Sequence, residues 1–315
     1  QPRKPMGRSD RASGVLSGIL NVRKPVGMTS HDVVDVVRLA ANTRRVGHAG
    51  TLDPAADGVL VVCVGKATRV SDLLMAGSKT YRATIRFGAS STTDDSEGTI
   101  TPTAERPCLS GCDLQGILAQ FIGEVDQVPP AFAAIKIGGR SLYERARAGE
   151  TMSIPPRRVR IDDIALVDFC DLVAVVTVTC SKGTYIRALA RDLGRALGTA
   201  AYLASLTRTR SGSFLVGDSL PLETIRRAGG RGYLDRLIYP IDAAVADWPA
   251  VVLDPPSVKI VRHGGTWKGS PGSSAIPRRA YDQVGRLVAL LSHVPAEAGW
   301  HPTTVFLEDQ GDDAG

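Results

Sequence analysis

One stretch, Arg44 to Gly65, constrains the rest of the chain more than any other. Its first half is polar and rich in glycine, with Asp53 before Pro54 and Asp57 close behind. Its second half, Val59 to Val64, is a nearly unbroken apolar run, which predicts a buried strand. An irregular loop anchored on such a strand can present side chains and backbone to a substrate. The same local features also fit two aspartates that only shape a turn.

The length and net charge of the chain limit the number of domains and the type of partner that we expect. A chain of 315 residues suggests about two domains and is long enough for a large core. Lys and Arg number 38 against 32 acids, giving a net charge of +6 and a pI near 9.2. This moderate basic excess is compatible with a polyanionic partner without requiring one.

The cysteines and the hydropathy pattern exclude several classes of protein. Cys108 and Cys112 are four residues apart, but no His and no second pair of cysteines lies near them to complete a zinc site. The five histidines are scattered along the chain, so we expect no metal site. There is no signal-peptide pattern and no apolar run near 18 residues. We therefore expect a cytoplasmic protein that is neither secreted nor membrane-spanning.

Around the opening stretch the pattern predicts alternating strands and helices. Gly18–Val22 reads as a strand, and Ser30 as the N-cap of a helix. Lys66–Leu74 reads as a short helix. In Lys79–Gly88 apolar and polar residues alternate, so Tyr81 lies on the core face of a strand. Ser90–Gly98 reads as a loop, followed by a helix near 114–121.

The segment from 126 to 155 is basic and contains aromatic residues. It opens with Pro129 and Pro130, which resist helix, and a helix is predicted for Ser141–Ala148. Basic segments with interleaved aromatics can wrap an RNA backbone and stack bases, although a solvated surface hairpin has the same composition. Its cations are Lys136, Arg140, Arg145 and Arg147.

The following region predicts two strands, a helix and a third strand. Arg157–Phe169 and Asp171–Cys180 read as neighbouring antiparallel strands, with the turn at residues 169–171. Thr184 is the expected N-cap of a helix with a clear apolar stripe. Arg187 falls in its first turn, where a cation is disfavoured by the helix dipole, so an anionic partner such as Asp53 is expected. A solvent-facing arginine is the alternative.

The last third of the chain contains one more strand of the main domain and then a separate β-rich region. Leu203–Phe214 suits a strand with Leu206, Arg208 and Arg210 at alternating positions, and residues 248–305 read as a small β-rich C-terminal domain. The full expected organisation is a mobile leader at 1–16, a catalytic domain at 17–247 with an insertion at 126–155, the C-terminal domain at 248–305, and an acidic tail at 306–315.

Several motifs together carry a resemblance. The string GHAGTLDPAADGVL, with KPVGMTS upstream and CSKGTYIRALARDLG downstream, resembles the bacterial tRNA pseudouridine-55 synthase family of the TruB type. The resemblance covers roughly 18–218. It implies an α/β (α+β) fold, with a mixed, mostly antiparallel sheet flanked by helices, and conversion of uridine 55 in the T-arm loop of tRNA to pseudouridine. No cofactor or metal is implied, and we expect a monomer that binds tRNA.

The resemblance also assigns residues. It implies that Asp53 is the nucleophile, that Tyr81 packs on the target uracil, and that Arg187 pairs with Asp53 while Tyr185 lines the site. His48 is implied beside the flipped-out base, and Leu206 closes the pocket. The insertion, with Lys136, Arg140, Arg145 and Arg147, is implied to grip RNA. The K-P-x-G turn at Lys24 and Pro25 is implied to support the active-site loop.

The chemistry fits these residue types, with alternatives left open. Breaking N1–C1′ and rejoining the uracil through C5 needs a carboxylate that attacks C1′ or C6, or stabilises a sugar cation. An arginine beside it would keep it charged and could grip both its oxygens. An RNA-binding or tRNA-folding protein with secondary catalysis, and an aspartyl glycosidase, remain alternatives. Asp57 departs from the family, where a small neutral residue is common, and a second carboxylate could disturb Asp53.

Overall fold

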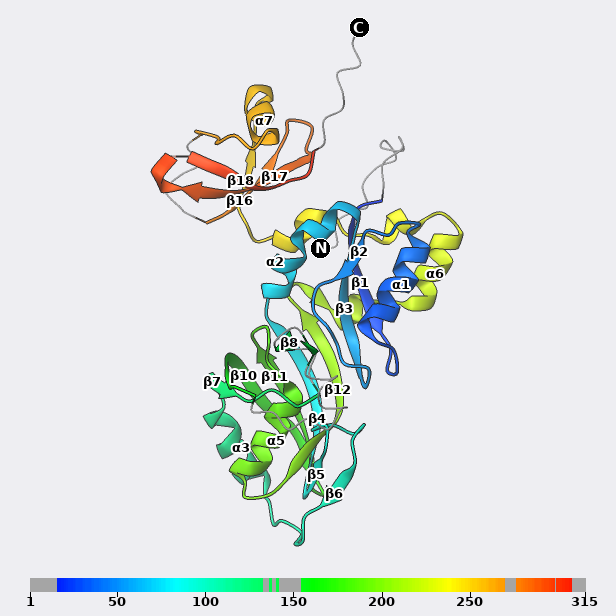
Figure 1. Ribbon diagram of the computed structural model, residues 1–315, viewed down its shortest axis with the longest axis vertical. Helices are drawn as coiled ribbons and strands as arrows, with labels where there is room; N and C mark the ends of the chain where they lie inside the picture. The colour runs from blue at the N-terminus through cyan, green and yellow to red at the C-terminus, as the bar shows by residue number, and fades with distance from the viewer. Residues whose placement is uncertain are drawn as a thin grey trace.

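The computed structural model describes residues 16–132, 136–137, 140–141, 154–269, 276–297 and 299–307. A ten-stranded sheet runs through the length of the main body (Figure 1), in the order β14-β1-β3-β12-β4-β11-β10-β7, with β2 on β3 and β13 on β12. Its strands are β1 (Gly18–Lys24), β2 (Val46–His48), β3 (Ala56–Val64), β4 (Lys79–Phe87), β7 (Gly123–Gln127), β10 (Arg157–Cys170), β11 (Val173–Cys180), β12 (Ala201–Ser211), β13 (Phe214–Leu215) and β14 (Leu220–Pro221).

The sheet is mixed and mostly antiparallel, as the sequence resemblance implied. Within this sheet, as far as its strands are described, only the pairs β1–β14 and β3–β12 are parallel. The predicted alternation on β4 is confirmed, since Tyr81, Ala83, Ile85 and Phe87 are all buried. β12 is the strand that joins the two halves of the sheet, because it pairs with β3 on one side and with β4 on the other.

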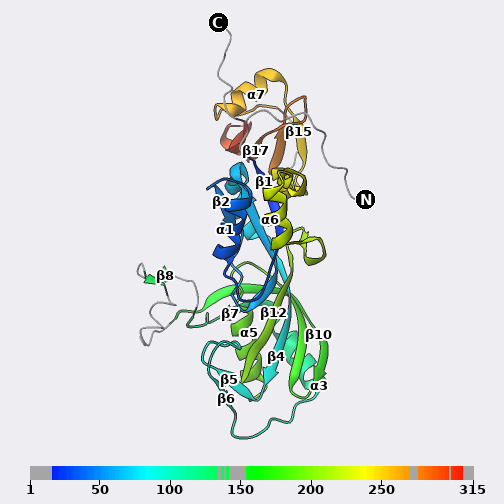
Figure 2. The ribbon, with the colours of Figure 1, turned by 90° about the vertical axis from the view of Figure 1, so that its right-hand side faces the viewer.

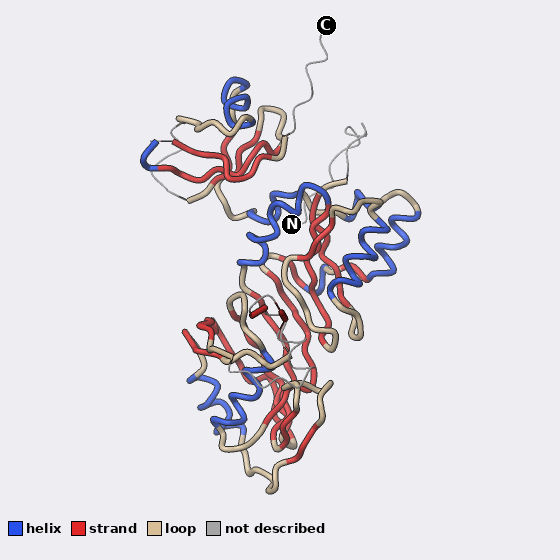
Figure 3. The backbone as a smooth tube through the Cα atoms, in the orientation of Figure 1, coloured by secondary structure: helices blue, strands red, loops and turns tan. Residues whose placement is uncertain are grey.

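Helices cover the two halves differently. At the β1–β3 half, α1 (Ser30–Ala40) and α6 (Leu222–Gly230) pack side by side on one face (Figure 2). At the β4–β10 half, α3 (Gly111–Gln120) and α5 (Ile186–Ala196) cover the core face, and the predicted apolar stripe of α5 is buried there through Ile186, Leu189, Ala190 and Leu193. Figure 3 shows these helices grouped at the two halves.

Shorter elements complete the main body. The other face of β1–β3 is covered by 3-10 and helical turns and by part of the C-terminal sheet. These elements are η1 (Gly65–Val70), α2 (Ser71–Ala76), η2 (Val216–Asp218) and η4 (Ile241–Val245). η3 (Leu234–Leu237) packs instead into the cluster of α1 and α6. A hairpin of β5 (Ala89–Ser91) and β6 (Ile100–Pro102) extends the β4 end. The predicted helix at Lys66–Leu74 is thus a 3-10 turn followed by one and a half α-turns.

The insertion is described only in part. Two short strands, β8 (Lys136–Ile137) and β9 (Arg140–Ser141), form a ladder of their own, and β8 projects from the main body in Figure 2. Of the predicted helix at Ser141–Ala148, only Ser141 is described, as the end of β9, and the rest lies outside the described residues. So do the side chains of Lys136, Arg140, Arg145 and Arg147.

A second sheet forms the C-terminal part. β15 (Ala250–Val252), β16 (Arg278–Tyr281), β17 (Leu287–Val294) and β18 (Gly299–Val305) pair in that order, with α7 (Pro255–Arg262) and η5 (Pro295–Glu297) beside them. Leu290 and Phe306 pack into the core cluster of the main body, so the two sheets share apolar contact. Within the described ranges, no helix combines the length and apolar character needed to cross a membrane.

Three predicted boundaries are wrong by one or two residues, each for a local reason. Thr29, not Ser30, caps α1, because Thr29 and Asp32 form a reciprocal capping box. Tyr185, not Thr184, is the N-cap of α5, because the Thr184 hydroxyl donates to the Ser181 carbonyl instead. The turn between β10 and β11 consists of Asp171 and Leu172, both at left-handed φ (47° and 63°), so that β10 extends to Cys170.

Candidate active site

An ion pair between Asp53 and Arg187 lies at the centre of the site. Asp53 sits in the loop between β2 and β3, and Arg187 in the first turn of α5. Arg187 Nε is 2.9 Å from Asp53 Oδ2, and the side chain of Arg187 is 8% exposed while that of Asp53 is 38% exposed. The predicted anionic partner is therefore found, and the carboxylate keeps one side open to solvent.

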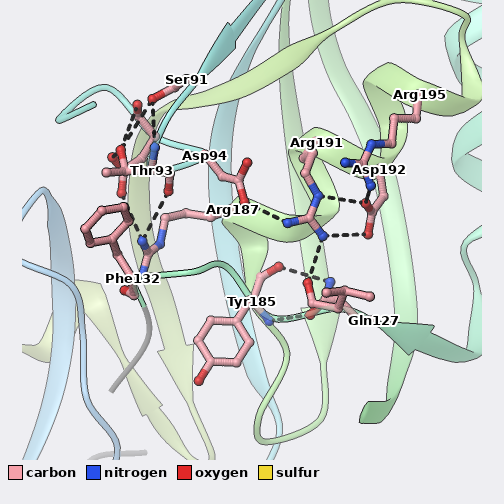
Figure 4. A network of polar contacts seen from close by, with 12 residues as sticks. Ser91, Thr93, Asp94, Gln127, Phe132, Tyr185, Arg187, Arg191, Asp192 and Arg195 are labelled. Atoms are coloured by element: carbon pink, nitrogen blue, oxygen red, sulfur yellow. Dashed lines mark hydrogen bonds and ion pairs between the residues drawn. The ribbon is translucent and has the colours of Figure 1, made fainter. Parts of the chain in front are cut away.

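Arg187 is shared among several acceptors instead of gripping both oxygens of Asp53. Its Nη1 lies 3.3 Å from Asp95 Oδ2 and donates to the Thr93 carbonyl, and its Nη2 donates to the Phe132 carbonyl at 3.2 Å. Figure 4 shows the guanidinium between Thr93 and Phe132. The expected two-oxygen grip is wrong, because Nε alone faces Asp53, in an ion pair without hydrogen-bond alignment. The arginine is fixed on three sides, and the nucleophile candidate occupies the fourth.

Asp94 and Asp95 are site residues that the sequence did not reveal. Both lie in the segment predicted only as a loop, and Asp95 is 5% exposed. The loop is attached to β12 by a bridge between Asp95 and Leu203. Asp94 Oδ2 accepts from Arg191 Nη1 at 2.8 Å, one helical turn after Arg187 (Figure 4). Burial raises the pKa of the Asp94 carboxyl, while the nearby Arg191 opposes that shift.

Behind the loop lies a buried cation, Arg208, whose role the sequence also did not reveal. Its side chain is 1% exposed. Nε donates to the Val59 carbonyl at 2.7 Å, Nη1 to Thr51 at 3.1 Å and Nη2 to Gly50 at 3.1 Å. These carbonyls lie on both sides of Asp53 in the chain, so a single guanidinium holds both arms of the loop. Gly58 is needed here, because a Cβ would lie 2.3 Å from the Arg208 carbonyl oxygen.

A second buried cation holds the loop from the α1 side. Lys24 Nζ donates to the carbonyls of Pro25, Met28 and Pro54, and Gly27 N donates to Pro54. Burial lowers the pKa of Lys24 to about 8. The expected support of the active-site loop by the K-P-x-G turn therefore has its contacts in the structure. Ser30 adds another, because its hydroxyl both accepts from Leu52 N and donates to Leu52 O.

The two tyrosines lie on different elements near the pair. Tyr81 is on β4, opposite Arg208 of β12, and burial raises the pKa of its hydroxyl while the Arg208 charge opposes the shift. Tyr185 precedes α5, and its ring points away from the arginine cluster in Figure 4. Burial also raises the pKa of Tyr185. Both phenols thus stay protonated at neutral pH, able to donate a hydrogen bond.

A narrow pocket lies beside Asp53. Its lining includes the charged residues Asp53, Asp95 and Arg187 and the apolar residues Leu203 and Leu206. Leu206 is therefore brought to the nucleophile candidate as predicted. The volume of about 10 Å³ accommodates about one water molecule, so a nucleobase enters only if the walls move. A larger hollow of about 410 Å³ lies around Phe87 and Tyr202 and contains none of the predicted site residues.

His48 and Asp57 complete the account of the predicted residues. His48 ends β2, is partly buried, and has a pKa lowered by burial and by the Arg208 charge. Asp57 accepts from the Thr207 hydroxyl and lies 3.6 Å from Arg23 Nη2, so its charge is engaged by partners of its own. Within the described residues, no group of three His, Cys, Asp or Glu side chains could hold a metal ion.

Known proteins with similar folds and sequences can now be compared. A chain in the crystal structure of a Cbf5–Nop10–Gar1 complex superposes with a TM-score of 0.69 at 26% identity, over 94% of this chain and 85% of that one. The chain is 41% identical over 296 residues to the tRNA pseudouridine synthase B of Pelotomaculum thermopropionicum, covering 91% of this chain and 93% of the relative. It is 44% identical over 258 residues to the protein of that name from Symbiobacterium thermophilum, covering 81% and 84%.

Family comparison agrees with these likenesses. Residues 38–186 match the TruB family pseudouridylate synthase (N terminal domain), and residues 187–246 match the tRNA pseudouridylate synthase B C-terminal domain. The fold and the sequence together define the class of the protein: it is a pseudouridylate synthase, an isomerase. The chain belongs to the TruB family of these enzymes, which confirms the resemblance drawn from the motifs.

Proposed function

We propose that this enzyme converts uridine 55 in the T-arm loop of tRNA to pseudouridine, with Asp53 as the nucleophile. One observation carries the assignment: Asp53 is a half-open carboxylate held against a buried guanidinium, on the wall of a pocket closed by Leu206. A carboxylate kept charged and partly accessible is what a nucleophile requires. The names of the curated relatives support tRNA as the substrate.

The reaction is an isomerisation, so no atom is gained or lost overall. The N1–C1′ bond breaks, the uracil turns, a C5–C1′ bond forms, and the proton leaves C5 while N1 becomes protonated. Asp53 acts on C1′ or C6, or stabilises a sugar cation, and is released at the end. Arg187 pairs with the carboxylate and aims it, because the other donors of Arg187 are fixed by Asp95, Thr93 and Phe132.

The remaining residues receive supporting roles. The target base must leave the stack of a folded RNA arm to reach Asp53. In the proposal Tyr81 packs on that base and assists at C5, Tyr185 lines the pocket, and His48 supports the gap left in the RNA. The insertion, with Lys136, Arg140, Arg145 and Arg147, binds the phosphate backbone, as its charge and aromatic content suggest.

The test follows the hydrogen on C5. A T-arm hairpin carrying [5-³H]uridine at the position of uridine 55 should release its tritium when the base is rejoined through C5. Asp53→Asn should abolish release and leave RNA affinity within about tenfold, or about 1.4 kcal/mol, because phosphate contacts supply most of the binding free energy. Asp57→Asn is the matched control, since it removes a neighbouring carboxylate from the same loop, and it should retain turnover.

Two results would overturn the proposal. Turnover by Asp53→Asn, once deamidation back to aspartate has been excluded by mass spectrometry, would show that Asp53 is not the nucleophile. Release from a hairpin labelled at any other uridine, with none at position 55, would remove the substrate assignment while leaving the enzyme class intact.

A further inference from the structure

The mechanism above does not use Gln127, a buried polar side chain at a point where two parts of the enzyme meet. Gln127 is the last residue of β7 and is 4% exposed. Its Cα partner in the sheet is Arg157, the first residue of β10. The segment between these two residues contains the insertion, so Gln127 marks the root of the insertion on the sheet.

The side chain of Gln127 does not extend toward the insertion; it binds the start of α5. Its Oε1 accepts from Tyr185 N at 2.8 Å, and its Nε2 donates to Tyr185 O at 3.1 Å (Figure 4). One amide thus satisfies both backbone groups of a single residue, as a neighbouring strand would. Tyr185 is the N-cap of α5 and makes no side-chain cap hydrogen bond, so Gln127 supplies the polar contact that this helix start requires.

Two further contacts join the same two segments. Arg191 Nη2 donates to the Val128 carbonyl at 2.7 Å, and Arg187 Nη2 donates to the Phe132 carbonyl at 3.2 Å. The N-cap and the first two turns of α5 are therefore bonded to the chain at three points, Gln127, Val128 and Phe132. The Arg187 guanidinium that contacts Phe132 is also the one that contacts Asp53. A shift of the chain at Gln127 would therefore move the Arg187 guanidinium and change how it orients the Asp53 carboxylate.

We infer that Gln127 is a positioning residue, which fixes Tyr185 and Arg187 to the root of the insertion so that the Asp53–Arg187 pair keeps its geometry. This inference rests on the proposed function. Gln127 itself is buried against Tyr185 and touches neither the substrate nor the reacting atoms. Its contribution is the orientation of two residues that do.

The first test separates rate from binding. Gln127→Ala removes both bonds to Tyr185, and Gln127→Glu keeps the acceptor but loses the donor. At saturating hairpin, the single-turnover rate should fall about tenfold to a hundredfold in Gln127→Ala, with Gln127→Glu between it and wild type, while the hairpin Kd stays within about threefold. Gln120→Ala, which removes an exposed amide that bonds only within α3, is the matched control and should behave as wild type.

The second test asks whether the effect passes through Arg187. In an Arg187→Lys background the same Gln127→Ala change should cost less than about twofold, because the geometry it protects is already lost; a merely structural role would give the full loss again. Equal losses in both backgrounds, or a wild-type rate in Gln127→Ala, would overturn the inference.

A third readout needs no RNA. The ¹⁵N–¹H signal of Arg187 Nε should shift in Gln127→Ala and not in Gln120→Ala, and an unchanged signal would overturn the inference. This measurement distinguishes its failure from that of the proposed function, because the signal reports the position of Arg187 whether or not uridine 55 is the substrate.

Discussion

The two sides of the site are held together by different chemistry. On the loop side, Arg208 and Lys24 are buried cations whose donors end on backbone carbonyls, and among the described residues no carboxylate pairs with either. On the helix side, Arg187 and Arg191 are matched by Asp53, Asp94, Asp95 and Asp192. The loop side therefore fixes the shape of the backbone, and the helix side fixes the balance of charge around Asp53.

This difference predicts how each side fails. A carbonyl that loses its buried donor remains unsatisfied, so damage on the loop side should appear first as lost stability. A carboxylate that loses one of several partners can turn or change its contacts, so damage on the helix side should appear first as lost rate. Four substitutions test this distinction.

Arg208→Met should have the largest effect, on stability. The change leaves the carbonyls of Gly50, Thr51 and Val59 without their donor, and we expect a loss of about 3 kcal/mol in the free energy of unfolding. Denaturant titration measures it. Arg210→Met, an exposed arginine two residues further along β12 that donates to Gly212, is the control. Equal midpoints and slopes for the two variants would show that Arg208 does not hold the loop.

Arg187→Lys should come next, with its effect on rate. Lysine keeps the charge but offers a single point of contact, so it cannot bridge Asp53, Asp95 and the Phe132 carbonyl together. Single-turnover rates at saturating hairpin should fall about a hundredfold, with hairpin affinity unchanged. Arg195→Lys, an exposed change on the same helix, should be silent. A wild-type rate for Arg187→Lys would show that catalysis does not depend on the ion pair between Arg187 and Asp53.

Asp95→Asn should give a smaller loss of about tenfold in rate. The neutral amide still accepts from Arg187, but it no longer balances the guanidinium charge, so the arginine shifts toward Asp53. Asp57→Asn gives the contrast from the loop side, because Asp57 pairs with Thr207 and Arg23 and not with Arg187. If the two variants lose rate equally, the division of the site into two chemistries is wrong.

The smallest effect should be a pH dependence on the loop side. Because the folded pKa of Lys24 is about 8 and its ordinary value is 10.5, folded protein releases this proton before the unfolded chain does. At pH values between these two pKa values the unfolded state binds more protons than the folded state, so the free energy of unfolding rises with pH. Between pH 7 and 9, wild type should gain about 1 kcal/mol relative to Lys24→Met. The same comparison with Lys182→Met, at an exposed lysine, should give parallel curves.

The sequence predicted one of these sides much better than the other. The Asp53–Arg187 pair was predictable, because the helix dipole disfavours an unpaired cation in the first turn and because the family resemblance pairs these two residues. Asp94 and Asp95 were not, because acids in a turn-rich loop look solvated until the loop is seen bonded to β12 at Leu203. Arg208 was correctly predicted to lie on a strand. The alternation of residues along a strand predicts which face of the sheet a side chain occupies, but it does not predict which groups that side chain contacts. Its partners are carbonyls about 150 residues earlier in the chain, which no local pattern reveals.

Element types were largely predictable, and boundaries less so. The mixed sheet, its helices and the β-rich C-terminal part follow from periodicity and from the resemblance. The errors at Thr29 and Tyr185 arose where two neighbouring residues could each cap a helix, and the choice depended on a partner elsewhere: Ser30 was needed at Leu52, and Thr184 at Ser181. A tertiary hydrogen bond occupied Ser30, and a local one occupied Thr184.

The long separation between Arg208 and its carbonyls also orders events during synthesis. Gly50 and Arg208 are 158 residues apart, so the loop that carries Asp53 leaves the ribosome well before the guanidinium that fixes it exists. Contacts of such separation form late, because a long stretch of chain must first be closed. A nascent chain that stops before β12 would contain Asp53 but not the guanidinium that holds its loop. The enzyme therefore becomes competent only after most of its main body has been made.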